Sequence, residues 1–484
     1  MIYEIKSRLS NIAKVIFFLS YNKTLTTQVD IMRLFGTSGI RMKNLDPQIA
    51  YKVGFAVSQK VEDVVVARDS RTTGDLIKSA LTAGLLSGGA TVTDIGIVPT
   101  PTLGFSTRNF EVGVMITASH NPPEYNGIKL FNRDGTPYSP EEEREIEETI
   151  SKNNFKRADW SSVGEVLRYE NALREYREHI LKHLSISRSF NVVVDCANGA
   201  SSVISPHLFT DVGSHVISLN AHLDGRFVGR MPEPNKENLQ ETMKVVRGLN
   251  EREGNYIGIA HDGDGDRMVA IDERGRMADF DKLLAIFSKY IVEKTGSKVV
   301  ITTVDASMSL DEYLGDKVKV VRTKVGDVAV SQALSKYNAL FGGEPSGTWI
   351  HGDVHLTPDG ILSGLRVLEM MEYFDEKLCI LLDEVPSYVN LREKIPCEEC
   401  KKSSVMKYVI EYGERIFQRT PETVDGARFN LENGWILIRP SGTEPYIRIR
   451  VEGKDNTIAK DLLERGIKLV RKALKNELYI NNGF

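Results

Sequence analysis

Short strand-like runs recur along the chain, and nine of them form three similar groups. Opening runs rich in valine lie at 64–69, 192–195 and 299–303. After a spacer of helical length, second runs lie at 91–95, 215–219 and 318–321. Third runs close the groups at 112–116, 256–260 and 339–341. Strand, helical spacer and strand is the βαβ pattern, so the groups predict one unit used three times, with parallel strands and right-handed crossovers.

Each closing run leads into a loop of unusual composition. The loops are Thr-Ala-Ser-His-Asn-Pro at 117–122, His-Asp-Gly-Asp-Gly-Asp-Arg at 261–267, and Gly-Gly-Glu-Pro-Ser-Gly-Thr at 342–348. Open α/β sheets bind ligands outside the carboxyl ends of their strands. We therefore expect the three loops to face one shared cleft.

After about residue 384 the pattern changes to two strands that flank a polar loop at 439–444, followed by an apolar-periodic helix at about 457–475. The predicted fold class is α/β: three similar βαβ-type domains with mixed sheets, plus a smaller α+β C-terminal domain, around a central cleft. A length of 484 residues fits three or four domains. The predicted domain bounds are 32–170, 171–274, 275–383 and 384–484.

The first 31 residues carry a short apolar run at 15–19, preceded by Lys6, Arg8 and Lys14 as in a signal peptide. The run is too short to span a bilayer and has no small-residue cleavage site after it. Met32, a plausible second start, stands directly before the first motif. We interpret 1–31 as an appendage that a mis-assigned start would explain, and expect no membrane anchor.

Composition adds little to this pattern. With a net charge of −4 and 26% charged residues, the chain has no overall positive electrostatic field that would attract nucleic acid. Any bound anion would therefore need a local binding site. Four cysteines suggest a reducing compartment, the cytoplasm. The C-x-x-C pair Cys397 and Cys400 has no further ligands nearby in sequence, so neither a zinc nor a redox role is favoured.

The acidic loop alternates Asp262, Asp264 and Asp266 with glycines. A solvated acidic turn is the alternative, but such a turn rarely follows an apolar strand, whereas glycines allow three carboxylates to converge on a hard cation such as Mg²⁺. A calcium-binding helix-loop-helix does not fit, because Arg267 stands where that loop needs glycine and the flanks read as strands. The loop therefore predicts a magnesium site.

The other loops admit two interpretations each. Ser119 is an ordinary turn serine on its own, with no esterase elbow around it, but opposite a magnesium site it can carry a phosphoryl group. Glu344 and Ser346 suit sugar hydroxyls, although a plain turn explains them nearly as well. In the fourth unit a polar hairpin would explain the serine and glycine but not two arginines, so a phosphate cradle is favoured; its residues are Arg439, Ser441, Gly442, Thr443 and Arg448.

Together these motifs resemble the α-D-phosphohexomutase superfamily over about residues 32–475. The resemblance implies a phosphoserine at Ser119 and one Mg²⁺ held by it with Asp262, Asp264 and Asp266. It places in the catalytic centre Arg41, His120, Lys129 as a proton-transfer group, and Arg267. It assigns sugar binding to Glu344, Ser346 and the position of Thr348, and binding of the phosphate that is not transferred to the cradle. Several members have histidine where this chain has Thr348, so a proton-transfer role does not carry over to that position.

Within the superfamily the runs 343–350 and 355–361 are similar to archaeal proteins described as probable phosphoglucosamine mutases. This implies a cytoplasmic isomerase that interconverts glucosamine 6-phosphate and glucosamine 1-phosphate through a bisphosphate. The expected partner is the hexose phosphate substrate, with no nucleic acid and no membrane; the sequence predicts no oligomeric state. The alternatives are the phosphomannomutase/phosphoglucomutase branch and, more remotely, a magnesium-dependent sugar phosphatase or a non-catalytic sugar-phosphate binder.

Overall fold

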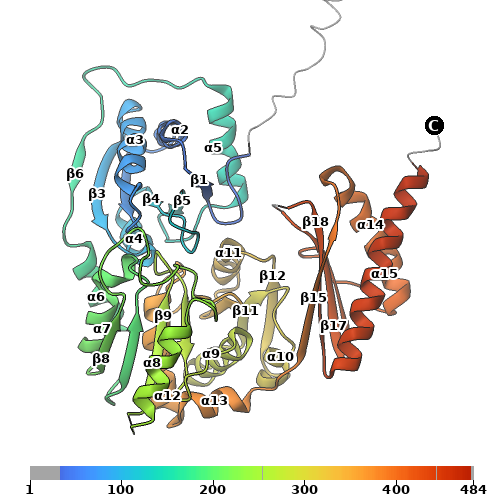
Figure 1. The fold of residues 1–484 in the computed structure, drawn as a ribbon. Helices are drawn as coiled ribbons and strands as arrows, with labels where there is room; N and C mark the ends of the chain where they lie inside the picture. Colours follow the sequence, from blue (N-terminus) through green and yellow to red (C-terminus); the bar gives the residue numbers. More distant parts are fainter. Residues whose placement is uncertain (1–32, 253, 443, 481–484) are drawn as a thin grey trace, which may run out of the picture.

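The structure, a computed structural model, describes residues 33–252, 254–442 and 444–480 (Figure 1). The segment 1–31, interpreted above as an appendage, lies outside these residues. Four sheets follow one another along the chain, and each has helices packed on it. The first three sheets form the larger part of the molecule, and the fourth stands to one side with its two helices (Figure 1).

The first sheet has the strand order β1-β5-β4-β2-β3-β6. Its strands are β1 (Ile40–Lys43), β2 (Asp63–Arg68), β3 (Thr91–Ile97), β4 (Val112–Ile116), β5 (Tyr125–Asn132) and β6 (Val166–Arg168). Its helices are α2 (Pro47–Val57), α3 (Gly74–Ser87), α4 (Thr100–Ser106) and α5 (Pro140–Lys152), with a 3₁₀ turn η1 (Thr107–Asn109).

The second sheet has the order β10-β9-β7-β8 and the third the order β12-β11-β13-β14. The second comprises β7 (Asn191–Asp195), β8 (His215–Leu219), β9 (Tyr256–His261) and β10 (Met268–Ile271), with α6 (Ala172–Lys182), η2 (Ala200–Val203), α7 (Ser205–Asp211) and α8 (Gln240–Asn250). The third comprises β11 (Val299–Thr303), β12 (Lys319–Thr323), β13 (Gly342–Glu344) and β14 (Thr348–Ile350), with α9 (Phe280–Thr295), α10 (Ser309–Leu314), α11 (Asp327–Tyr337), α12 (Gly360–Phe374) and α13 (Leu378–Glu384).

One strand arrangement recurs in these three sheets. The opening strand is central, and it pairs in parallel with the second and third strands of its unit. An antiparallel strand, β5, β10 or β14, then pairs with the third strand. The parallel pairing and the repeated mixed-sheet unit predicted from the apolar runs are confirmed.

The third strand of the third unit is displaced from its predicted place. The apolar run 339–341 precedes the strand, which is formed by the glycines of β13 and by Glu344. The glycines are required by packing, because a Cβ on Gly342 would lie 2.9 Å from Val330 and a Cβ on Gly343 would lie 2.6 Å from the Trp349 ring. The supposed sugar loop is therefore a tight hairpin of β13 and β14.

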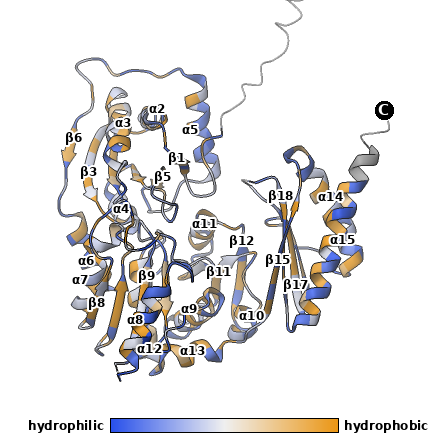
Figure 2. Cartoon of the chain, in the orientation of Figure 1, coloured by the Kyte–Doolittle hydropathy of each residue, from blue (hydrophilic) through white to orange (hydrophobic). Residues whose placement is uncertain are grey.

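The fourth sheet is antiparallel, in the order β15-β18-β17-β16. Its elements are β15 (Val389–Pro396), β16 (Ala427–Leu431), β17 (Gly434–Pro440) and β18 (Tyr446–Gly453), with α14 (Glu399–Phe417) and α15 (Asn456–Ile480). Figure 2 shows α15 with both hydrophobic and hydrophilic positions along its length, as expected for a helix with one face on a sheet. This unit has its own apolar core between sheet and helices.

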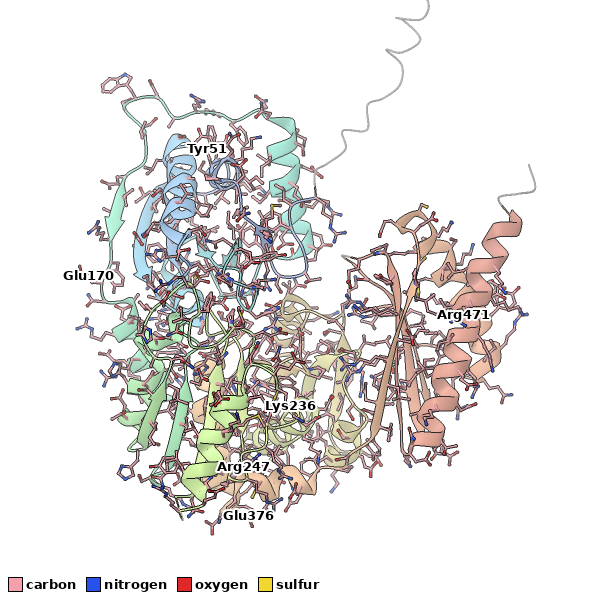
Figure 3. All side chains as sticks on the ribbon, viewed as in Figure 1. Tyr51, Glu170, Lys236, Arg247, Glu376 and Arg471 are labelled. Atoms are coloured by element: carbon pink, nitrogen blue, oxygen red, sulfur yellow. The ribbon has the colours of Figure 1, made fainter. Side chains whose placement is uncertain are left out.

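The second and third sheets share a core that includes α12. At Gly364 of α12 the contact is so close that a Cβ would lie 2.8 Å from Ile259 of β9. Charged side chains such as Glu170, Arg247 and Glu376 are exposed on the outer surface (Figure 3). None of the helices in the described part of the chain has both the length and the apolar content needed to cross a bilayer.

Candidate active site

Ser119 lies in the loop after β4, where it is fully buried and has a φ of 51°. A left-handed conformation is strained for a residue other than glycine, and such strain persists only where the surroundings hold it. The Ser119 N–H donates to Thr117 Oγ1 at 2.8 Å, and the hydroxyl donates to Asp262 Oδ2 at 2.7 Å. His120 Nδ1 lies 3.3 Å from the same hydroxyl. The loop thus presents the serine hydroxyl to the acidic loop of the second unit.

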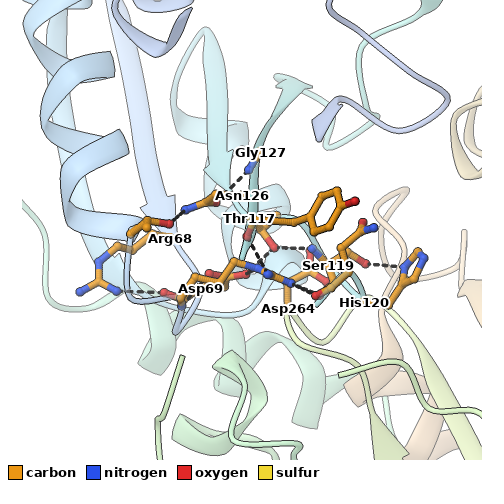
Figure 4. A network of polar contacts seen from close by, with 12 residues as sticks. Arg68, Asp69, Thr117, Ser119, His120, Asn126, Gly127 and Asp264 are labelled. Atoms are coloured by element: carbon orange, nitrogen blue, oxygen red, sulfur yellow. Dashed lines mark hydrogen bonds and ion pairs between the residues drawn. The ribbon is translucent and has the colours of Figure 1, made fainter. Parts of the chain in front are cut away.

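Arg71 fixes the backbone of this loop. It is buried, and its five N–H donors are all used: Nε binds Asp69 Oδ2 at 3.0 Å, and the others bind the carbonyls of Ser119, Asn121, Pro122 and Tyr125. Asp69 also accepts from Thr117 Oγ1 at 2.6 Å (Figure 4). Sequence reasoning missed both residues. The available signal was the charged run Arg-Asp-Ser-Arg directly after a buried strand.

The acidic loop follows β9 and brings its three carboxylates together. One oxygen each from Asp262, Asp264 and Asp266 lies within 4.8 Å of the others. The glycines make this possible, because Gly265 has a φ of 74° and a Cβ on Gly263 would lie 2.6 Å from the Ser119 carbonyl. The loop is therefore tightly curled and packed directly on the serine loop.

The electrostatics of this cluster call for a cation. Burial and repulsion from Asp266 and Asp264 raise the pKa of Asp262 well above its usual value. Lys129 of β5 donates to Asp264 at 2.8 Å and to Asp266 at 2.5 Å. Although burial opposes its charge, these two carboxylates raise the pKa of Lys129. The Oδ1 atoms of Asp264 and Asp266 are buried without a hydrogen-bond partner. A cluster of carboxylate oxygens, two of which have no hydrogen-bond partner, is a suitable set of ligands for Mg²⁺.

Two arginines and a histidine surround the serine and the carboxylates. Arg41 of β1 lies 3.5 Å from both His120 Nδ1 and Asn121 Oδ1. Arg267 Nε lies 3.9 Å from Asp266 Oδ1. Burial, with Arg267 and Arg41 nearby, lowers the pKa of His120 to about 2. Thr100 of α4, which sequence reasoning missed, donates to Asp264 at 2.7 Å.

A cavity of about 290 Å³ opens beside this centre, with walls from all four sheets or their loops. Of the residues singled out in the sequence, it is lined by His120, Arg267, Glu344, Ser346, Thr348, Arg439, Ser441, Gly442 and Arg448. Thr443 lies outside the described residues. Ser119, Lys129 and the three aspartates are buried next to the cavity and do not form its wall.

On the third-unit wall, Glu344 ends β13 and Thr348 begins β14. Burial, together with the nearby charge of Asp327, raises the pKa of Glu344 to about 8. Ser346 Oγ donates to Glu344 at 3.1 Å, and Glu344 Oε1 is buried without a partner. These are groups that can exchange hydrogen bonds with neutral hydroxyls.

On the fourth-unit wall, the polar loop connects β17 to β18. Arg439 pairs with Asp425 at 2.9 Å, and Arg448 pairs with Glu444 at 2.7 Å. Lys402 of α14 supports the loop from behind, since its buried ammonium donates to the carbonyls of Ser441 at 2.6 Å and Glu444 at 2.8 Å. Asp425 and Lys402 were not predicted from the sequence, because they lie in other elements than the loop.

Comparison with known families matches four models in chain order. Three are described as phosphoglucomutase/phosphomannomutase, alpha/beta/alpha domain I, II and III, over residues 32–157, 174–275 and 279–388. The fourth, the C-terminal domain of the same family, matches residues 394–468.

Individual relatives cover nearly the whole chain. It is 67% identical over 443 residues to the phosphoglucosamine mutase of Methanocaldococcus jannaschii, which covers 91% of this chain and 99% of that protein. It is 45% identical over 452 residues to a probable phosphoglucosamine mutase of Pyrococcus abyssi, covering 92% and 99%. A solved phosphoglucomutase/phosphomannomutase family protein of Burkholderia thailandensis matches with a TM-score of 0.81 at 26% identity, over 91% of this chain and 97% of that one.

Proposed function

The chain belongs to the phosphoglucomutase/phosphomannomutase family of the α-D-phosphohexomutase superfamily, and on that premise we propose that it interconverts glucosamine 6-phosphate and glucosamine 1-phosphate. It is an enzyme of the isomerase class, a phosphohexomutase. The choice of glucosamine is supported by relatives that are 60–67% identical over more than 90% of the chain and are named phosphoglucosamine mutases.

The contact that supports the reaction best is the 2.7 Å hydrogen bond from Ser119 Oγ to Asp262, inside a cluster of three carboxylates. In the proposed cycle, phospho-Ser119 transfers its phosphoryl group to the free hydroxyl of the sugar monophosphate. A P–O bond to the sugar forms and the bond to Ser119 Oγ breaks, while the sugar hydroxyl loses a proton and the serine oxygen gains one. Ser119 then takes back the other phosphoryl group from the bisphosphate.

The residues that would hold Mg²⁺ are Ser119, through its phosphoryl group, and Asp262, Asp264 and Asp266. The unsatisfied Oδ1 atoms of Asp264 and Asp266 support this assignment. When bound, the cation supplies positive charge that neutralises the phosphoryl oxygens during transfer. Lys129, which bonds to two of the three carboxylates, is the proposed carrier of the transferred proton.

The remaining assignments follow from the position of each group at the cavity. Arg41, His120 and Arg267 surround the serine and add positive charge or hydrogen-bond capacity for the phosphoryl oxygens. Arg439, Ser441, Gly442 and Arg448, with Thr443, would bind the phosphate that is not being transferred. Because the bisphosphate must be used from either end, this cradle has to accept the sugar in two orientations.

A panel of 6-phosphates tests the proposal. The enzyme is incubated with Mg²⁺, a trace of hexose bisphosphate, and glucosamine, glucose or mannose 6-phosphate, and both 1-phosphate formation and inorganic phosphate are measured. We expect conversion without net phosphate release and the highest kcat/KM with the glucosamine compound. Glucose or mannose preferred by tenfold or more would assign the chain to the other branch. Net phosphate release would indicate a phosphatase, and no turnover at all a binder.

A further inference from the structure

Two carboxylates line a cavity that is otherwise suited to an anion. Arginines and hydroxyls form most of its wall, and the acidic residues among the lining are Glu344 and Asp327. A carboxylate near a phosphorylated substrate weakens binding by repulsion unless it meets a donor or a cation there. Each of the two accepts a hydrogen bond from one serine, Ser346 for Glu344 and Ser38 for Asp327, and has its other oxygen left for a ligand group.

Glu344 is suited to a neutral partner. It is buried, its pKa is raised to about 8 by that burial and by the charge of Asp327, and it has one unsatisfied oxygen. A carboxyl group that is protonated near neutral pH can both donate to and accept from a hydroxyl. A neutral carboxyl group is a poor partner for a positively charged group of the ligand.

Asp327 has a different environment. It is the first residue of α11, follows Gly326 with a φ of 135°, and is half-buried at the cavity wall. Ser38, from the first unit, donates to its Oδ1 at 2.6 Å. Within the described side chains no lysine, arginine or histidine forms an ion pair with this carboxylate, so its charge is balanced only through space by groups such as Arg41 and Arg267.

We propose that Asp327 binds the protonated amine at C2 of glucosamine phosphate and thereby sets the preference for the amino sugar. The inference rests on the proposed function, which it deepens by naming the residue that reads C2. A free amine of this kind titrates near pH 8, so it is largely charged at neutral pH. With glucose or mannose phosphate a hydroxyl replaces the ammonium, and Asp327 then meets a neutral donor beside a phosphate.

The alternative is that Asp327 only joins the first and third units through Ser38. The two roles differ in a measurable way. A purely structural carboxylate affects every hexose phosphate equally, because it acts on the shape of the cavity. An amine-binding carboxylate affects the amino sugar selectively, because only that substrate carries the matching charge.

The test is the ratio of kcat/KM for glucosamine 6-phosphate to that for glucose 6-phosphate, measured with Mg²⁺ in wild type, Asp327→Asn and Asp327→Glu. We expect the ratio in Asp327→Asn to fall by roughly 5–150-fold, the range for one buried donor left without its partner. Asp327→Glu keeps the charge and should retain part of the ratio. Asp311→Asn is the matched control, since Asp311 lies in the same unit on α10 and pairs with Arg322; its ratio should equal that of wild type.

The outcomes separate the two proposals. A wild-type preference for the amine that disappears in Asp327→Asn supports the inference. A preference that persists in Asp327→Asn, or equal losses for both sugars, overturns the role of Asp327 and leaves the proposed function intact. A wild type without the preference overturns both. If Asp327→Asn does not fold, Asp327→Ser gives the same ratio test.

Discussion

Two buried arginines support the serine loop and the acidic loop in the same way. In the first unit Asp69 follows β2 and pairs with Arg71, which holds the Ser119 carbonyl. In the second unit Asp195 ends β7 and pairs with Arg230, which donates to the His261 carbonyl at 2.5 Å. Each carboxylate lies at or just after the carboxyl end of the central strand, and each carbonyl lies at the end of the third strand or in the loop after it. The repeated unit thus carries a repeated device for fixing loop backbone.

Replacing Arg71 by methionine should damage both stability and turnover. The change leaves Asp69 buried without its counter-ion, which costs about 3–5 kcal/mol, and releases four carbonyls of the serine loop. We expect a lower urea midpoint for the first unfolding transition and a kcat reduced by at least tenfold. Lys152→Met in the same unit is the control: Lys152 pairs with Glu148 on the surface of α5, so its loss should cost about 0–1 kcal/mol. Equal effects of the two changes would contradict the positioning role of Arg71.

Replacing Ser119 by alanine should abolish turnover and leave the fold intact. The hydroxyl is the proposed phosphoryl carrier, and alanine adds no atoms to a buried position. Intact-mass analysis of active wild type should show a population heavier by one phosphoryl group, which the variant lacks. Ser404→Ala, on the surface of α14, serves as the matched control and should keep both the activity and the heavier species. Near-normal turnover in Ser119→Ala would remove the proposed mechanism.

The residues proposed for the chemistry could be singled out in the sequence, but the residues that support them could not. Ser119 and the aspartates stand in loops, and Arg439 stands near the end of β17, where the composition is unusual next to apolar residues, so a local pattern reveals them. Arg71 and Lys402 act on carbonyls 48 and 39 residues away in the chain, respectively, and no local pattern encodes such partners.

At the scale of elements, the repeated βαβ pattern predicted most strands within a few residues, because buried parallel strands are continuous apolar runs. β13 is the exception. Its backbone packs so closely against Val330 and the Trp349 ring that glycine replaces the expected apolar residues. Ala339 and Phe341 of the run 339–341 are buried, but the strand begins only after them, so the apolar run does not mark the strand here.

Helix α14 supports the loop of the phosphate cradle through the buried ammonium of Lys402. Lys402→Met removes two charge-assisted hydrogen bonds to the loop carbonyls, each worth about 1.5–3 kcal/mol. We expect KM for the hexose 6-phosphate to rise by roughly tenfold or more, with a smaller change in kcat. The inhibition constant of inorganic phosphate should rise in parallel.

Lys407→Met on the same helix is the control, because Lys407 is exposed. Its KM and phosphate inhibition should match wild type. If Lys402→Met lowers the melting temperature but changes neither KM nor phosphate inhibition, Lys402 stabilises the fourth unit without positioning the cradle.

At the scale of the whole molecule, the third unit uses an acidic residue that follows its central strand to hold the fourth unit. Asp305, just after β11, pairs with Arg450 of β18 at 2.9 Å. Arg428 of β16 donates to the carbonyls of Val304 and Ala306. The fourth unit has a separate core, and a small apolar cluster of Val304 with Trp435 and Leu437 adds to the polar contacts at this junction. An acidic residue at or just after the end of the central strand thus orients loop backbone in the first two units, and orients the fourth domain in the third unit.

The first and second units, by contrast, meet at the proposed metal site, so a metal bound there would link them. Lys129 and Ser119 come from the first sheet and its loop, while the three aspartates come from the second. A ligand that binds only the folded state stabilises it by about 2.7 kcal/mol at 100 times its dissociation constant. Adding Mg²⁺ to chelator-treated enzyme should therefore raise the melting temperature and restore turnover together.

Asp264→Asn removes one of the three carboxylates, so both responses to Mg²⁺ should be strongly reduced in this variant. Asp375 is an exposed surface carboxylate, so Asp375→Asn should respond as wild type does. A melting temperature that does not depend on Mg²⁺ in wild type, with activity retained in chelator, would show that the acidic loop is a turn held by Lys129 and not a metal site.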